Sequence, residues 1–100
     1  MIADLRERFL PRFIQTARQR AARATGALDS AQGMAVAVTE FHALAGEAAI
    51  LELLDIATLA RQGEKAARGA SSRGPGEART ECERVLGQIE AAVDALLPST

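Results

Sequence analysis

The sequence predicts an all-α protein, an antiparallel four-helix bundle with a short extra helix at the N-terminus. Residues that favour helices, Ala, Leu, Glu, Gln and Arg, dominate the chain, whereas β-branched residues are sparse. Apolar residues recur every three or four positions, and no segment shows the sustained alternation of a half-buried strand. A chain of 100 residues can bury one small core, so we expect a single domain over residues 1–100.

The N-terminal quarter is expected to form two helices that meet at a proline. Pro11 has no amide hydrogen and disrupts a helix interior, but it suits the first turn of a helix. Residues 2–10 are therefore predicted to form a short helix and residues 11–25 a second one, with a kink between them. Thr25 followed by Gly26 is typical of a helix C-terminus.

The next helix is predicted from residue 29 to about residue 51. Asp29 or Ser30 can cap it by accepting a hydrogen bond from a free backbone amide. Gly33 is interpreted as a tolerated weak point near its start. No glycine or proline marks the end of this helix, so a break near residues 52–54 has to be inferred.

Two further helices complete the predicted bundle. One runs from the break to about Gly69, and the glycines, serines and proline of residues 69–76 predict a loop. The last helix is expected to begin near Glu77 and to end before Pro98. Its apolar residues have the spacing of a buried stripe; they are Cys82, Val85, Leu86, Ile89, Val93, Leu96 and Leu97. The single cysteine cannot form an internal disulfide and is expected to pack as a small apolar residue.

The charge pattern argues against nucleic acids and membranes as partners. The formal net charge of -1 gives no general attraction to polyanions. Residues 1–25 carry six arginines, but neither Trp nor Tyr lies among them, so we interpret them as a solvated helix face. No apolar segment approaches the ~20 residues of a membrane span, and charge follows Met1 too closely for a signal peptide. We therefore expect a cytoplasmic protein.

His42 is the only histidine and lies within the helix predicted for residues 29–51. Because each helical residue advances about 100°, the expected core stripe occupies a sector of roughly 80°. This stripe comprises Ala37, Phe41, Leu44, Ala48 and Leu51. The histidine lies about 140° from the middle of that sector. Its side chain is therefore predicted to face solvent.

The neighbours of His42 on its own helix face are small and uncharged. Positions three, four and seven residues away stack above and below it; they are Ala35, Val38, Thr39, Ala45, Gly46 and Ala49. A solvent-exposed face normally carries long charged side chains, so this pattern favours a docking surface for a partner. Gly46 supports that interpretation, because glycine inside a helix costs ~1 kcal/mol relative to alanine. The alternative is chance in an alanine-rich sequence.

A single exposed imidazole restricts the chemistry that the protein can perform. Metal binding needs several ligands, and with no second histidine and one cysteine we expect no metal site. The chain also lacks the glycine-rich nucleophile turn of a hydrolase. A histidine can still act as a nucleophile when a partner supplies the rest of the active site. Phosphoryl transfer fits this arrangement, because its catalysis depends mainly on positioning and charge neutralisation.

The stretch HALAGEAAIL at residues 42–51, followed by LLDIATLARQGEKAA at residues 53–67, resembles the histidine-containing phosphotransfer (HPt) domain family. The family pattern reads H-x-L-K-G-S/A-A-x-x-L-G and continues as L-x-x-L-A-x-x-L-E on the next helix. The apolar and small positions in register are Leu44, Gly46, Ala48, Leu51, Ile56, Leu59 and Ala60. The resemblance implies that His42 is the phosphoacceptor and that Glu64 can reach it from the adjacent helix. An acid that accepts from Nδ1–H would leave Nε2 as the nucleophilic nitrogen.

Four positions depart from that pattern. Ala45 stands where a lysine usually lies near the phosphoryl group, and Glu47 replaces a small residue. Glu52 replaces the glycine that normally turns the chain between the two helices, and Gly63 stands where a leucine is usual. By helix geometry Ala45 lies within about 60° of His42, so its lack of charge is expected to affect the site.

The function implied by the resemblance is that of a phosphocarrier with no turnover of its own. His42 would accept a phosphoryl group from a sensor kinase or from an aspartyl phosphate on a response-regulator receiver domain, and pass it to another receiver. No cofactor of its own is expected, and Mg²⁺ is expected on the partner receiver. The alternative is a degenerate HPt-like module, or an unrelated helical bundle, that binds a partner without phosphotransfer.

Overall fold

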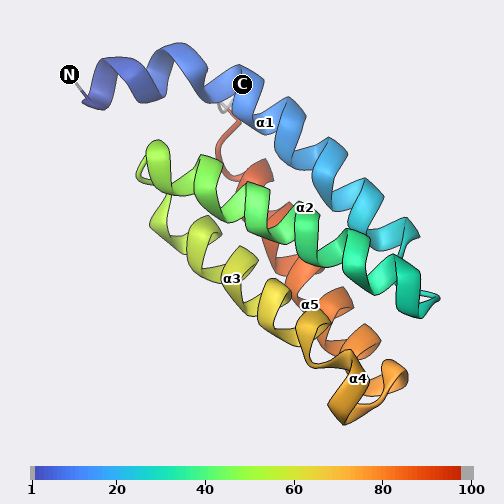
Figure 1. Cartoon of the computed structure of the whole chain (residues 1–100). Coiled ribbons are helices and arrows are strands. Elements are labelled where there is room, and N and C mark those ends of the chain that lie inside the picture. The colour runs from blue at the N-terminus through green and yellow to red at the C-terminus, as the bar shows by residue number, and fades with distance from the viewer. Residues whose placement is uncertain (1, 98–100) are drawn as a thin grey trace.

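The computed structural model describes residues 2–97, which form helices joined by short turns and contain no strand. The helices are α1 (Ile2–Gly26), α2 (Ala31–Ile50), α3 (Leu54–Arg68), α4 (Ala70–Arg73) and α5 (Pro75–Asp94). The four long helices lie side by side and alternate in direction (Figure 1), and α2 packs against both α1 and α3. The predicted all-α bundle is confirmed.

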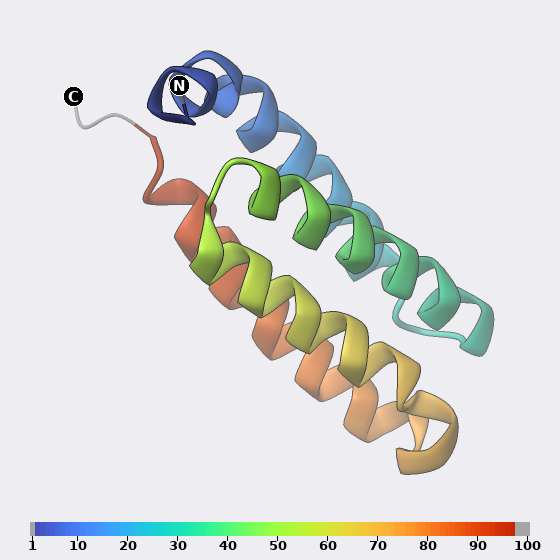
Figure 2. The same ribbon diagram turned by 60° about the vertical axis from the view of Figure 1, so that its left-hand side comes forward.

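The first helix is longer than predicted, because it continues through its proline. Pro11 lies inside α1, so residues 2–10 are the first turns of this helix and not a separate one. Phe13 and Ile14, just after the proline, are buried in the core, and this packing holds the helix together although one backbone hydrogen bond is missing. The first turns of α1 run at an angle to the rest of the helix in both ribbon views (Figure 2), as expected for a proline kink.

The start of α2 depends on a serine cap and on a glycine. The Ser30 hydroxyl accepts a hydrogen bond from the Gly33 amide at 2.9 Å, so Ser30 is the cap. Gly33 is more than a tolerated weak point, because a Cβ atom at this position would collide with the carbonyl oxygen of Ala27. The glycine therefore allows the turn between α1 and α2 to pass close to the helix.

The break predicted near residues 52–54 is confirmed and has the geometry of a Schellman motif. The amide of Leu53 donates to the Ala48 carbonyl at 2.8 Å, and the amide of Glu52 donates to the Ala49 carbonyl at 3.0 Å. Glu52 has a φ of 58°, the left-handed conformation for which glycine is preferred. Arg6 of α1 reaches this turn and donates to the carbonyl oxygen of Glu52 at 3.1 Å.

The segment between α3 and α5 is not entirely a loop. Residues 70–73 form the single turn of α4, and α5 begins at Pro75, two residues before the predicted start. Proline fits this first position of a helix because the amide it lacks would have no intrahelical partner. Most of the predicted stripe of α5 is buried, including Cys82, but Leu97 is exposed and lies beyond the end of the helix.

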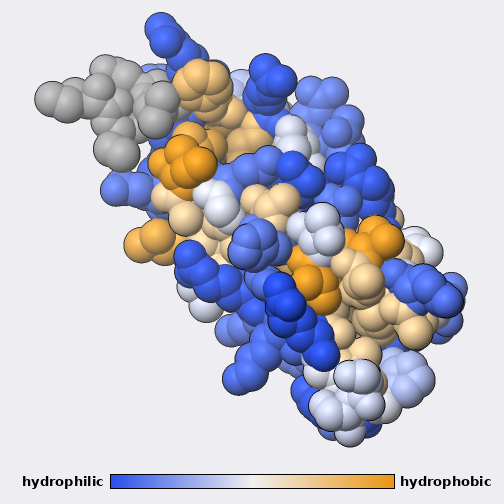
Figure 3. Space-filling model, in the orientation of Figure 1, coloured by the Kyte–Doolittle hydropathy of each residue, from blue (hydrophilic) through white to orange (hydrophobic). Residues whose placement is uncertain are grey.

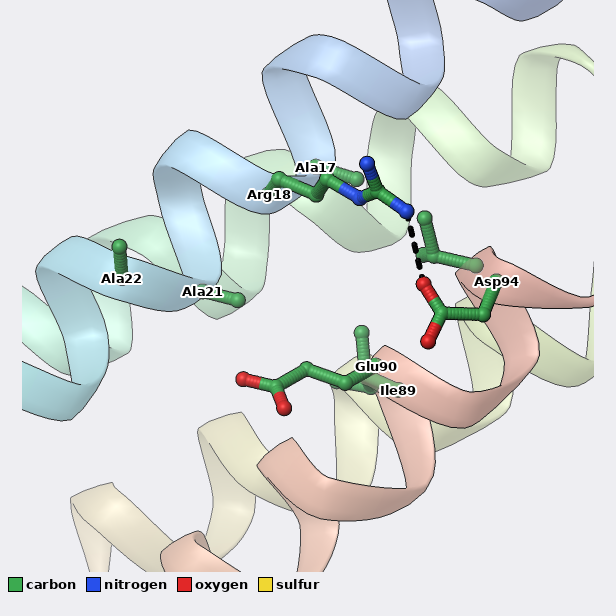
Figure 4. A pocket seen from close by; sticks show the side chains of 8 residues that line it. Ala17, Arg18, Ala21, Ala22, Ile89, Glu90 and Asp94 are labelled. Carbon is green, nitrogen blue, oxygen red and sulfur yellow. Dashed lines mark hydrogen bonds and ion pairs between the residues drawn. The ribbon is translucent and has the colours of Figure 1, made fainter. Parts of the chain in front are cut away.

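A pocket of about 260 Å³ lies between α1 and α5, away from His42. Ala17 and Ala21 contribute to its wall, and small side chains of this kind leave space between the two helices (Figure 4). Arg18 of α1 reaches across to Asp94 of α5, with 2.7 Å between Nη2 and Oδ1. None of the helices within residues 2–97 is long and apolar enough to cross a membrane.

Candidate functional site

His42 projects from the middle of α2, next to the boundary with α3. Its side chain is 75% exposed, which confirms that it faces solvent. The stripe predicted to be buried on the same helix is also confirmed, from Ala37 to Leu51. The fold thus keeps one side of α2 in the core and holds the imidazole at the surface.

Glu64 of α3 lies against the imidazole, as the resemblance implied. Its carboxylate oxygens are 3.2 and 3.3 Å from Nδ1 of His42. The Glu64 side chain is only 17% exposed, so it is held under the rim of the site. Two successive helices joined by a short turn bring the two side chains together.

Arg68 is a further member of the site that the sequence reasoning missed. It lies one helical turn after Glu64 and donates to Oε2 of that carboxylate through Nε at 3.0 Å and Nη2 at 2.8 Å. The spacing of four residues between an acid and a base on one helix could have revealed it. The Arg68 side chain is 62% exposed, so its guanidinium is accessible to solvent while it contacts Glu64.

The charge of Glu64 is stabilised from two sides. Hydrogen bonds from Arg68 lower its pKa most strongly, and the hydrogen bond from His42 lowers it further, whereas burial acts in the opposite direction. The carboxylate therefore stays ionised near neutral pH and acts as an acceptor. A neutral imidazole beside it carries its hydrogen on Nδ1, which leaves the lone pair on Nε2 facing solvent. This geometry can present a nucleophilic nitrogen to a partner.

The residues predicted to surround His42 differ in their exposure. Ala35, Thr39 and Gly46 are exposed, and Val38 and Ala49 are half-buried against the core. In the space-filling view, apolar and weakly polar residues are grouped along the exposed face of α2, with hydrophilic residues among them (Figure 3). A Cβ atom on Gly46 would meet no atom within 4 Å, so nothing in the described part of the chain requires glycine there.

Ala45 does not belong to this open surface. It is only 5% exposed and is part of the hydrophobic core, so its assignment to the docking surface is wrong. The reason is that α2 packs against two helices, and its buried sector widens to about 120°, beyond the stripe that the sequence suggested. The cation close to Glu64, the hydrogen-bond partner of His42, is Arg68 of α3.

A shallow groove borders the exposed face of α2. Its volume is about 570 Å³, and Met34, Val38, Arg68 and Pro75 are among its lining residues. It contains both apolar surface and one guanidinium. Among the side chains that the structure describes, those of residues 6–97, no group of three or more potential metal ligands comes together.

Comparison with known proteins identifies the family. No curated protein and no solved structure gives a significant match to this chain. Residues 8–97, by contrast, match the Hpt domain family, so the match covers α2, α3 and α5 and all of α1 except its first turns, and it includes His42, Glu64 and Arg68. Hpt domains serve histidine phosphotransfer in two-component systems, where they interact with receiver domains and kinases. The chain therefore belongs to the Hpt domain family.

Proposed function

We propose that this protein is a phosphorelay carrier in which His42 accepts a phosphoryl group and exchanges it with an aspartate of a response-regulator receiver domain. The observation that carries the proposal is the exposed His42 imidazole with Nδ1 held 3.2 Å from the Glu64 carboxylate. It is the arrangement that a phosphoaccepting histidine needs, since one nitrogen is oriented and the other is accessible.

In the proposed transfer the Nε2 lone pair attacks the phosphorus of an aspartyl phosphate. A bond between nitrogen and phosphorus forms, the bond between phosphorus and the aspartate oxygen breaks, and the aspartate leaves as a carboxylate. The ring keeps its hydrogen on Nδ1 and acquires positive charge, which the ionised Glu64 stabilises. Mg²⁺ bound to the receiver would neutralise charge on the phosphoryl oxygens. The reverse sequence returns the group to a receiver.

Arg68 is proposed to supply the positive charge that the family pattern places on the lysine replaced here by Ala45. Its guanidinium is already tied to the carboxylate that orients His42 and is largely exposed. Attraction to a phosphoryl group would be weakened by solvent and salt. We expect Arg68→Gln to slow phosphorylation severalfold, chiefly at low ionic strength, as read by side-by-side labelling with one donor. If Arg68→Gln is phosphorylated at the same rate as wild type at both low and high ionic strength, Arg68 does not have this role.

The test of phosphotransfer is incubation with a panel of receiver domains labelled on their aspartates. We expect label to move to this protein from its cognate receiver, to be lost in acid and to survive base, as a phosphoramidate does. His42→Gln should take up no label. Acid-stable label, or label retained by His42→Gln, would contradict the proposal. Binding of a receiver without transfer would favour the degenerate module.

The partner is proposed to dock on the small residues around His42. Gly46→Arg is the sharpest test, because a Cβ atom at this exposed position would have no atom within 4 Å. It should weaken receiver binding strongly while helical content stays unchanged. Gly87→Arg is the matched control, since Gly87 lies exposed on α5 with no atom within 4 Å of its Cβ position. Equal affinity for both variants, measured by titration, would mean that the small residues arose by composition alone.

A further inference from the structure

The core contact directly beneath the site is unusually close. Phe41 of α2 is 1% exposed, and its ring lies on the backbone of Gly63 in α3. A Cβ atom on Gly63 would lie 2.6 Å from both Cδ1 and Cζ of that ring. Any side chain at position 63 would therefore force either the ring or the helix to move.

This contact lies next to the functional pair along both helices. Phe41 precedes His42 and Gly63 precedes Glu64, so the buried pair and the hydrogen-bonded pair lie at the same level of the boundary between α2 and α3. Neighbouring helical residues point about 100° apart, which places one pair in the core and the other at the rim. A displacement of either helix at the buried pair is transmitted to the rim, because the backbone between adjacent residues is stiff.

The position of Gly63 is also constrained from α5. The thiol of the buried Cys82 lies 3.9 Å from the Gly63 carbonyl oxygen, within hydrogen-bonding distance for sulfur. The backbone of α3 at this point thus contacts a ring from one neighbouring helix and a thiol from another. Little free space is left into which α3 could move to accommodate a methyl group.

We propose that Phe41 and Gly63 form a positioning pair: the ring packed on bare backbone sets the separation of α2 and α3 at which the Glu64 carboxylate meets Nδ1 of His42. The inference rests on the proposed function of His42 for its effect on phosphotransfer. Its effect on the imidazole itself can be measured without any phosphoryl donor. Both residues are buried, so neither would touch the phosphoryl group.

The test changes the volume of the pair in both directions. Gly63→Ala overfills the contact, Phe41→Leu underfills it, and the double variant Phe41→Leu/Gly63→Ala restores part of the volume. The ¹⁵N NMR shifts of the His42 ring, recorded where the ring is neutral, report the fraction that carries its hydrogen on Nδ1. Glu64→Ala gives the reference for a ring without its acceptor. Gly87→Ala is the matched control, because its Cβ position is open.

We expect both single variants to shift the ring towards the Glu64→Ala spectrum and the double variant to lie closer to wild type than either. The phosphorylation rate of Gly63→Ala should fall about ten-fold or more, since misplacement on the ångström scale has such effects. Gly87→Ala should match wild type in both measurements. If Gly63→Ala does not fold, the comparison of Phe41→Leu with the double variant still decides the matter.

Two results would overturn the proposal. One is a wild-type ring spectrum in every variant of the pair that folds. The other is a double variant that departs from wild type as far as the more affected single variant, because the two positions would then act separately. If wild-type protein accepts no label from any receiver while the ring spectra respond as expected, the proposed function fails and the positioning pair stands.

Discussion

The two long edges of α2 are joined to their neighbours in different ways. Towards α1, the Arg20 guanidinium donates to both carboxylate oxygens of Glu47, at 2.9 and 2.8 Å, and to Glu40 at 3.0 Å. Towards α3, the ring of Phe41 rests on the backbone of Gly63. Long charged side chains can adjust to small shifts of a helix, whereas a ring on bare backbone cannot. The site lies on the edge whose spacing is fixed by close packing.

The comparison also explains one departure from the family pattern. Glu47 replaces a small residue close to His42 in the sequence, yet its carboxylate turns to the opposite edge of α2 and binds Arg20. The pKa of Arg20 is raised, above all by its hydrogen bonds to Glu47. The added acid therefore belongs to the attachment of α1 and leaves the exposed face of α2 uncharged.

The largest expected effect is on the closely packed edge. Phe41→Ala should lower the free energy of unfolding by about 3–5 kcal/mol, because it opens a cavity in a packed core. Val36→Ala on the exposed side of the same helix should change it by less than about 0.5 kcal/mol. Urea denaturation followed by circular dichroism measures both. Similar small losses for the two variants would mean that this edge does not depend on the ring.

A substitution on the charged edge, between α2 and α1, should lower the free energy of unfolding less than Phe41→Ala does. Arg20→Met should cost about 1–2 kcal/mol, because it leaves the largely buried Glu40 with fewer donors. Arg18→Met is a suitable control: the side chains of Arg18 and Asp94 are 51% and 65% exposed, and such a pair contributes little. The same denaturation experiment applies. A loss at Arg20 that equals or exceeds the loss at Phe41 would reverse the comparison.

In the turn between α2 and α3, one substitution should stabilise the protein. Glu52→Gly is expected to raise the free energy of unfolding by about 1 kcal/mol, since glycine adopts the left-handed conformation without strain. Glu83→Gly, inside α5, makes the same chemical change in regular helix and should cost about 1 kcal/mol. Changes of opposite sign in the free energy of unfolding of the two variants would confirm the strain at Glu52. Changes of the same sign would exclude it.

The smallest effect concerns the rim of the site and depends on pH. The pKa of Glu64 is lower in the folded protein than its ordinary value of 4.5, so its ionisation stabilises the fold above that pH. This contribution is lost as the pH falls through the lowered pKa. Glu64→Gln should therefore be less stable than wild type at pH 7, and the gap should narrow on acidification below about pH 4. A gap that is constant with pH would assign the loss to packing.

Much of the fold follows from local pattern. The three-and-four spacing predicted most of the buried residues on α2 and α5, among them Phe41 and Val93, because a helix repeats at a fixed angle. The burial of Ala45 did not follow, because the width of a buried stripe depends on how many helices pack against it. The continuity of α1 through Pro11 was also missed, since burial of neighbouring residues outweighs one lost hydrogen bond.

The site was predicted in part. The position and exposure of His42 followed from helix geometry, whereas Glu64 came from the family resemblance, because nothing local indicates which residue of the next helix faces it. Arg68 could have been found from its spacing to Glu64. The contact between Phe41 and Gly63 could not, since it depends on the register between two helices. The family pattern marked Gly63 only as an unusual residue.

The separation of the site residues along the chain bears on the order in which the protein folds. His42 and Glu64 are 22 positions apart, on helices that are joined by a three-residue turn. Arg18 and Asp94, by contrast, are 76 positions apart. Closing a short loop costs less chain entropy than closing a long one. The hairpin of α2 and α3, with the histidine and its acid already paired, is therefore expected to form early, and the contact of α1 with α5 to close the bundle last. The order in which backbone amides become protected from exchange during refolding would record this sequence of events.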